Sequence, residues 1–147
     1  MGNEKSRFLK RDDGTIYDSV TSVTWMANDS FLDLDRDVSY SEAEDYVKET
    51  NNKKAGGYSD WRIPSIQEAS SIFNKEKLNK DSKGGDIFLD SVFPPGAANC
   101  TWTSSTRGKE AQIMFYANGC PYWYEKNDKT ISTMPTNRTI LKEARII

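Results

Sequence analysis

Residues 55–69 read AGGYSDWRIPSIQEA, and this stretch joins the two halves of the fold that the rest of the chain predicts. Gly56 and Gly57 let the chain reverse, because glycine adopts a positive φ without a steric penalty at Cβ. Trp61 and Ile63 alternate toward the core and predict a short strand. The stretch therefore begins as a reversal followed by an extended, buried segment.

A helix start follows directly. Pro64 keeps the chain extended, and Ser65 with Glu68 three positions later forms a capping box, the signature of a helix N-terminus. Arg62 is expected to pair with a carboxylate, with Asp60 and Glu68 as the two candidates. A buried pair of this kind fixes geometry more reliably than it adds stability. We therefore predict that the stretch is a structural hinge and not a ligand-binding site.

Upstream of the hinge, the pattern predicts a hairpin and a helix. A turn signal with a short alternating segment occupies 13–18, and 20–26 is rich in β-branched residues, with Trp25 expected in the core. Residues 39–51 carry an apolar stripe at helical spacing and open with a capping box at Ser39. The first residues, to about residue 12, show no such pattern, and we expect them to be flexible.

Downstream, the pattern predicts a sheet that the two amphipathic helices cover. Trp102 alternates with threonine and serine, Asn118-Gly119 predicts a two-residue hairpin, and Pro121 favours an edge strand because proline cannot donate to a ladder. The predicted strands are 100–105, 111–117, 120–125 and a last one at 139–147. Strands at both ends with helices between them make a single α+β domain over 1–147.

Composition excludes several kinds of active site. The 147 residues include no histidine, which removes serine-histidine and cysteine-histidine catalytic pairs and histidine-ligated metals. Cys100 and Cys120 are too few for a zinc-thiolate site, and we predict a disulfide or a packed thiol pair. The formal net charge of -2 gives no broad basic face for nucleic acid, and no apolar run is long enough for membrane insertion.

The segments DGTIYDSVTSVTWM, SYSEAEDYV, GGYSDWRIPSIQEA and TWTSST, in this order, resemble the Lcl C-terminal domain family. The resemblance runs from about residue 13 to the last predicted strand, and GYSDWRIPS is its most specific part. Through the same step into a helix and its tryptophan-rich strands, the family is similar to the C-type-lectin-like superfamily, which includes the formylglycine-generating enzymes. The resemblance implies a lectin-like α+β fold, in which two helices pack on a mixed, mainly antiparallel sheet. Some family members lie on bacterial surfaces and bind glycosaminoglycans or other polymers.

Calcium is an alternative that the acidic segment after residue 32 raises. Asp33, Asp35, Asp37 and Glu44 have the carboxylate spacing of an EF-hand loop. Val38 stands where that loop needs glycine, and Glu44 falls inside the predicted helix. The favoured prediction is therefore an exposed acidic loop with no metal or other cofactor.

Aromatic residues crowd the second predicted hairpin, where exposed rings can contact a sugar or a protein partner. The candidate ligand-binding residues are Tyr116, Tyr122, Trp123 and Tyr124, with Arg107 and Lys109 in the neighbouring loop. We predict a non-catalytic binding module for a glycan or a surface protein. A cysteine-dependent modifying enzyme and an oligomerisation domain, acting as a homo-oligomer, are the alternatives, and the sequence does not indicate a compartment.

Overall fold

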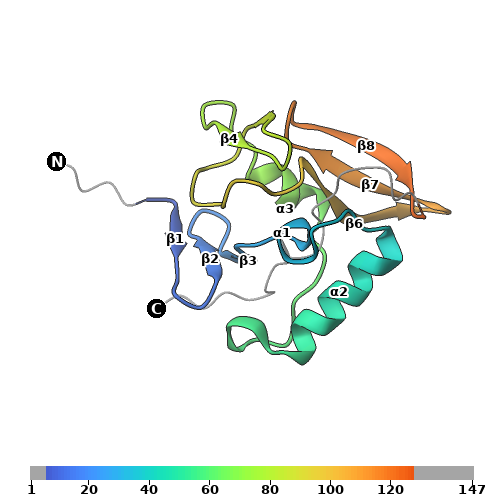
Figure 1. Ribbon diagram of the computed structural model, residues 1–147, viewed down its shortest axis with the longest axis horizontal. Coiled ribbons are helices and arrows are strands. Elements are labelled where there is room, and N and C mark those ends of the chain that lie inside the picture. Colours follow the sequence, from blue (N-terminus) through green and yellow to red (C-terminus); the bar gives the residue numbers. More distant parts are fainter. Residues whose placement is uncertain (1–5, 128–147) are drawn as a thin grey trace.

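The computed structural model describes residues 6–127, which form an α+β fold as predicted (Figure 1). These residues build three small antiparallel sheets, with strand orders β1-β2-β3, β4-β5 and β6-β7-β8, instead of one mixed sheet. The elements in chain order are β1 (Phe8–Lys10), β2 (Thr15–Asp18), β3 (Val23–Met26), α1 (Ser30–Leu34), α2 (Tyr40–Asn52), the 3-10 turn η1 (Ala55–Gly57), α3 (Ile66–Ser71), β4 (Asn79–Lys80), β5 (Asp86–Ile87), β6 (Cys100–Arg107), β7 (Glu110–Phe115) and β8 (Cys120–Glu125).

The predicted N-terminal hairpin is confirmed as β2 and β3, in which Ile16 lies opposite Trp25. Both side chains are fully buried. A further strand, β1, pairs with β2 and places Phe8 opposite Asp18, so part of the segment expected to be flexible belongs to the sheet. The strand β1 has only three residues, and so short a segment shows too little alternation to be recognised in the sequence.

Both capping boxes are confirmed. The Ser39 side chain accepts from the Glu42 N–H while the Glu42 carboxylate accepts from the Ser39 N–H, and Ser65 and Glu68 repeat the arrangement at α3. The reciprocal bonds satisfy N–H groups that a helix start leaves without partners. The two predicted helices therefore begin where the sequence indicates, whereas the short helix α1 was not predicted.

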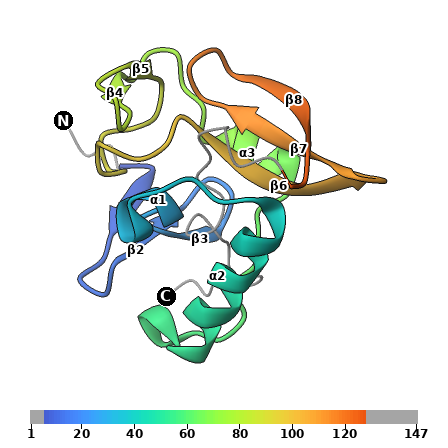
Figure 2. The same ribbon diagram turned by 45° about the vertical axis from the view of Figure 1, so that its right-hand side comes forward.

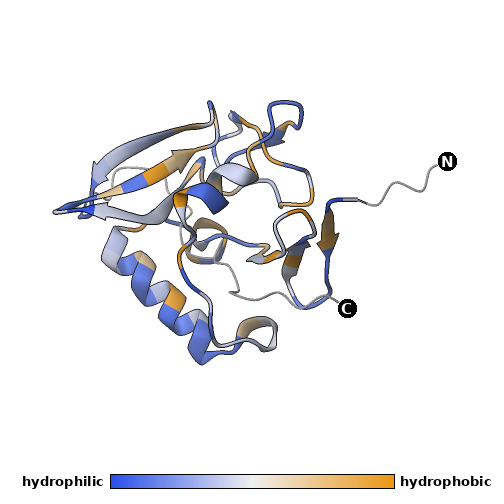
Figure 3. Ribbon diagram, turned by 180° about the vertical axis from the view of Figure 1, so that it is seen from behind, coloured by the Kyte–Doolittle hydropathy of each residue, from blue (hydrophilic) through white to orange (hydrophobic). Residues whose placement is uncertain are grey.

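The β6-β7-β8 sheet lies between α2 and α3 (Figures 1 and 2). Trp102 faces α2, where its ring meets the Tyr40 ring edge-on with centroids 5.4 Å apart and its Nε1 donates to Val38 O at 3.0 Å. Met114 faces the other side and packs in the same cluster as Ala69 of α3. Figure 3 shows the most hydrophobic residues of this sheet in its middle strand, with more polar colours on the outer strands.

The segment 61–63 departs from the predicted strand. Trp61 and Ile63 are buried as expected, but no ladder forms there. Instead, the Asn51 side chain at the end of α2 accepts from Trp61 N at 2.7 Å and donates to Trp61 O at 3.0 Å. One amide side chain thus replaces a neighbouring strand, and the buried backbone stays satisfied.

The second hairpin has a four-residue loop, not the predicted two-residue one. Phe115 pairs with Cys120, which leaves 116–119 in the connection, and Gly119 N donates to Phe115 O at 2.8 Å. The sequence signal located the reversal correctly, but Tyr116 leaves the ladder to enter the core. The predicted strand at 139–147 lies outside the described residues.

Candidate functional site

The hinge at 55–69 is structural, as predicted. Arg62 donates to both carboxylate oxygens of Glu68 at 2.9 Å, which decides between the two candidate partners. The hydrogen bond to Glu68 raises the pKa of Arg62. Burial pushes the pKa of Glu68 upward, but the bonds from Arg62 and Ser65 outweigh it and leave that pKa below its usual value. Gly56 has a φ of 63°, and a Cβ there would lie 2.7 Å from the Thr15 side chain.

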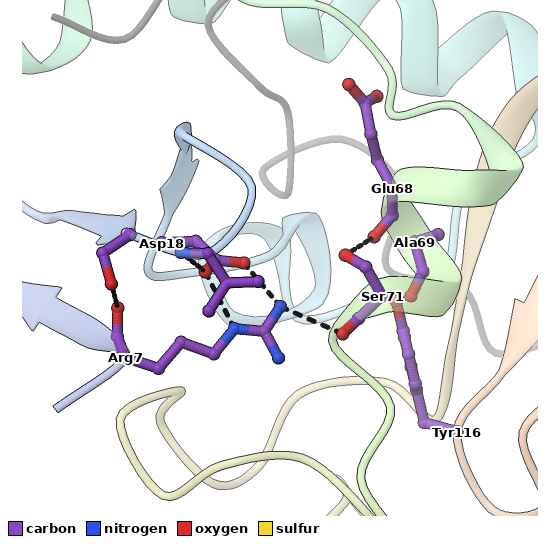
Figure 4. A network of polar contacts seen from close by, with 8 residues as sticks. Arg7, Asp18, Glu68, Ala69, Ser71 and Tyr116 are labelled. Carbon is purple, nitrogen blue, oxygen red and sulfur yellow. Dashed lines mark hydrogen bonds and ion pairs between the residues drawn. The ribbon is translucent and has the colours of Figure 1, made fainter.

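Tyr116 was predicted to contact a ligand, and the structure shows that this is wrong. Its side chain is fully buried, and its hydroxyl donates to Ala69 O at 2.8 Å (Figure 4). Its backbone N–H donates to Asn99 O at 2.8 Å, and its carbonyl accepts from Phe88 N at 3.0 Å. The physical reason is that α3 needs partners for its last carbonyl groups, and Tyr116 supplies one of them.

A second partner for the end of α3 comes from the N-terminal sheet. Arg7 donates through Nε and Nη2 to the Asp18 carboxylate at 2.8 and 2.6 Å, and its Nη2 also donates to Ser71 O at 3.0 Å (Figure 4). Burial raises the pKa of Asp18, but the bonds from Arg7 and from the Val20 N–H bring it below its ordinary value. This network joins the N-terminal sheet to the end of α3.

Cys100 and Cys120 form neither the disulfide nor the packed thiol pair that were predicted as alternatives. Cys100 is buried on β6 and Cys120 is exposed on β8, and both lie opposite Phe115 of the strand between them. Two strand spacings put the cysteines about 9–10 Å apart, beyond the Cα separation that a disulfide allows. Burial raises the pKa of the Cys100 thiol well above its usual value. The alternative of a cysteine-dependent enzyme therefore lacks the close pair it requires.

The acidic segment does not gather into a calcium loop. Asp33 lies in α1, where it accepts a hydrogen bond from the Tyr46 hydroxyl of α2, and Asp35 ends that helix in the left-handed region. Glu44 points from an exposed position on α2. Within residues 6–127, no group of three or more Cys, Asp or Glu side chains is placed to hold a metal ion.

Of the remaining predicted residues, Tyr122, Trp123 and Tyr124 lie on β8, the outer strand of its sheet, whereas Arg107 ends β6 and Lys109 lies in the turn that follows it. We refer to Arg107, Lys109, Tyr122, Trp123 and Tyr124 as the β8 surface. The Arg107 guanidinium lies over the Trp123 ring, 4.2 Å from its centroid, and its Nε donates to Glu110 Oε1 at 2.8 Å. The Arg107 side chain nevertheless keeps 60% of its surface exposed. The stack and the ion pair hold a largely exposed cation in one orientation.

Tyr122 and Tyr124 lie on the opposite face of β8 from Trp123, as the alternation predicts. Tyr122 is 39% exposed, meets the Phe115 ring edge-on and accepts a hydrogen bond from Asn118 Nδ2 at 2.8 Å. Tyr124 is half-buried against the cluster around Trp102. Among these two, Tyr122 is therefore the ring that a ligand can reach.

Shallow hollows adjoin this surface. One of about 360 Å³ lies between the turn that carries Lys109 and the end of β8, and includes Glu125. Another, of about 470 Å³, lies at the start of α2 beside Lys126. A third, of about 340 Å³, lies between α2 and the hinge and includes Arg62 and Ser104. The first is the one that the β8 surface borders directly.

Sequence reasoning missed Glu110 and Glu125. Glu110 follows Arg107 at a spacing of three across a Gly-Lys turn, a signal that a hairpin prediction at 106–111 would have exposed. Glu125 lies opposite Glu110 in the ladder, so two carboxylates face each other across neighbouring strands. That pairing of carboxylates depends on the register between β7 and β8, which was not predicted from the sequence.

One comparison with known proteins identifies a family. The model of the Lcl C-terminal domain matches residues 14–135, which is most of the chain. No curated protein and no solved structure matches the chain significantly. No helix within residues 6–127 is long and apolar enough to span a membrane.

Proposed function

The chain belongs to the Lcl C-terminal domain family, and from that premise we propose that it is a non-catalytic binding module whose β8 surface binds a glycan that carries carboxylate groups. The observation that supports this most directly is the stack of Arg107 on Trp123. It presents a fixed cation on an exposed sheet edge, where a long extended ligand has access.

Arg107 supplies the directional contact. Its Nε is held by Glu110, whereas its Nη1 and Nη2 make no hydrogen bond within residues 6–127. Two such N–H groups side by side match the two oxygens of a carboxylate and form charge-assisted bonds. The Trp123 ring beneath the guanidinium reduces the side-chain entropy that binding would otherwise remove.

The neighbouring residues suit a sugar chain. Lys109 adds a second exposed cation at the turn, and Tyr122 offers a partly exposed ring on the other side of the strand. Aromatic rings provide large rigid contact areas for the apolar faces of sugars. Because the whole chain has a net charge of -2, attraction for an anionic ligand is local to this surface.

A distant relationship to C-type-lectin-like domains is part of the proposal. The hinge that leads into α3 and the tryptophan-bearing strands β6 and β8 support it. In this proposal the glycan lies across the sheet edge and needs no metal, since the acidic segment at 33–37 lies elsewhere in the fold.

The test is a glycan and polyanion array, run with and without calcium, on the wild-type chain and two arginine variants. Arg107→Ala removes the proposed contact, and we expect it to weaken binding about tenfold or more. Arg36→Ala is the matched control, because Arg36 is also an exposed arginine (53% of its side chain) paired with a glutamate. It should change the affinity less than about twofold.

Circular dichroism shows whether both variants keep the fold. Absence of binding to every acidic glycan in both conditions would contradict the proposal, and so would equal losses in the two variants. Binding that requires calcium would contradict only the proposal that the glycan binds without a metal.

A further inference from the structure

The free edge of β8 has a definite set of exposed backbone groups. Lys126 N donates to Lys109 O at 2.8 Å, which continues the β7-β8 ladder one residue beyond Glu125. In an antiparallel pair, hydrogen-bonded and non-hydrogen-bonded positions alternate. Tyr122 and Tyr124 therefore direct their backbone groups toward β7, whereas Pro121, Trp123 and Glu125 direct theirs outward.

No described element lies beyond this edge (Figures 1 and 2). The outward groups are the N–H of Trp123, the N–H of Glu125 and the carbonyls of all three residues, because proline has no N–H. An open edge of this kind is a template for pairing with another strand. Pro121 shortens the template at one end without closing it.

We propose that β8 of one copy pairs antiparallel with β8 of a second copy, centred on Trp123, so that the two sheets become one continuous sheet. In this register each Trp123 N–H donates to Trp123 O of the other copy, and each Glu125 N–H donates to Pro121 O. Because proline has no N–H, the hydrogen bond from residue 121 to Glu125 O is lost once at each end of the paired strands, and the other bonds are kept. A two-fold axis through the centre makes the interface self-complementary.

Charge complementarity favours a second copy as the occupant of this edge. Within one chain Glu125 faces Glu110, and like charges directly opposite each other are unfavourable. In the proposed pair, Glu125 is diagonal to Trp123 of the other copy, where the Arg107 guanidinium of that copy lies over the ring. Diagonal neighbours are within reach of long side chains. The same register places Tyr122 opposite Tyr124 and Glu125 opposite Pro121, so no two acidic side chains of the paired β8 strands face each other.

The inference goes beyond glycan binding and does not depend on it, since the pairing needs no ligand. A paired β8 edge excludes a glycan that lies across the same edge, so the two proposals predict that dimerisation and glycan binding compete. Its first test is analytical ultracentrifugation of the full chain over a range of concentrations. We expect a monomer–dimer equilibrium for the wild type. Glu125→Pro, which removes an outward N–H and leaves the β7 ladder intact, should raise the dissociation constant about tenfold or more, whereas Glu125→Gln keeps that N–H and should retain the dimer.

A wild-type chain that stays monomeric up to about millimolar concentration would overturn the proposal. Pairing that appears only after Pro121→Val would also overturn it, because Pro121 would then be blocking the edge. If Glu125→Pro dimerises as well as the wild type, the contact lies elsewhere and the proposal is wrong.

Disulfide trapping tests the register, and it remains informative if Glu125→Pro fails to fold. Pairing centred on Trp123 sets the exposed Cys120 opposite Lys126 of the second copy, at a non-hydrogen-bonded position whose Cα separation suits a disulfide. Under mild oxidation, Lys126→Cys should give a covalent dimer that is lost when Cys120→Ser is added. Asn127→Cys is the control, because its side chain lies on the other face of the strand. Equal cross-linking by both cysteines would refute this register.

Discussion

At the scale of single residues, the aromatic side chains of the second hairpin show how one residue type takes several roles. Tyr116 is fully buried and closes the end of α3, Tyr122 is partly exposed, and Trp123 carries the Arg107 guanidinium. All three occur within eight positions and look alike in the sequence. Their roles differ because the loop at 116–119 turns one ring into the core and leaves the others on an edge strand.

Tyr116→Phe tests the first of these roles. The substitution removes the hydroxyl that donates to Ala69 O and leaves that carbonyl without this partner in the core. We expect the free energy of unfolding to fall by about 1–2 kcal/mol in chemical denaturation. The control is Tyr122→Phe, whose exposed hydroxyl bonds to Asn118 and whose loss should cost less than about 0.5 kcal/mol. Equal losses in the two variants would contradict the role of the Tyr116 hydroxyl as a stabilising partner of Ala69 O.

At the scale of elements, residues close in the sequence set the backbone conformation of the turns and helix caps. Whether a turn also packs tightly depends on side chains from other elements. Gly108 and Gly119 both have positive φ in hairpin connections, with values of 56° and 75°. A Cβ at Gly108 would meet nothing within 4 Å, whereas one at Gly119 would lie 2.5 Å from the Phe73 ring. The same residue type therefore serves backbone conformation at one turn, and both conformation and close packing at the other.

Gly119→Ala and Gly108→Ala separate these two effects. Each substitution forces a side chain into the left-handed region, at a cost of about 1–2 kcal/mol. Gly119→Ala must also displace Phe73, so we expect its loss of unfolding free energy to exceed that of Gly108→Ala by about 1 kcal/mol or more. Thermal or chemical denaturation of the pair measures the difference. A smaller loss for Gly119→Ala would mean that the hairpin does not pack on Phe73.

At the scale of the whole molecule, the Arg7–Asp18–Ser71 network joins the N-terminal sheet to α3. Asp18 is fully buried, and the Arg7 side chain is 29% exposed. Burial raises the pKa of Asp18, but the bonds from Arg7 and from the Val20 N–H outweigh it, so the pKa in the folded chain lies below its ordinary value. A lowered carboxyl pKa stabilises the fold above the ordinary pKa of about 4, and that stability is lost as the pH falls through the folded value.

Asp18→Asn should show this dependence. The variant leaves Arg7 without its counter-charge, and we expect a loss of about 3 kcal/mol at pH 7, near the low end for buried pairs because Arg7 is partly exposed. The difference from the wild type should shrink as the pH falls below about 4, where Asp18 is protonated in the unfolded chain. Denaturation curves between pH 7 and pH 2 measure it.

The exposed pair of Lys80 with Asp86 provides the control for this prediction. Asp86→Asn should change the unfolding free energy by less than about 1 kcal/mol at pH 7, since exposed ion pairs contribute little. A difference between wild type and Asp18→Asn that stays constant with pH would contradict the assigned role of Asp18.

Much of the fold was predictable where the signal is local. The capping boxes at Ser39 and Ser65, the hairpin around Trp25 and the pairing of Arg62 with a nearby carboxylate all lie within a few residues of their partners. The strand β1, the helix α1 and the loop at 116–119 were not predicted. They are short or depend on distant partners, so their local patterns are weak.

The candidate site was predicted in part, for the same reason. Alternation along 120–125 placed Trp123 and Tyr122 on opposite faces of an edge strand, and Pro121 indicated that edge. The stack of Arg107 on Trp123 was not predicted, because it requires β6 and β8 to lie on either side of β7 with a shifted register after Trp102. A register of this kind is set by packing on both faces of the sheet.

By itself, the sequence determined the family, the α+β class, the helix starts and the hinge at 55–69, because each rests on contacts between residues close in the chain. Only the tertiary structure decided that Tyr116 is a core residue, that Cys100 and Cys120 lie too far apart for a disulfide, and that Glu125 faces Glu110 on an open edge. Those outcomes depend on which strands become neighbours, and neighbours are chosen by burial of the whole core rather than by any short segment.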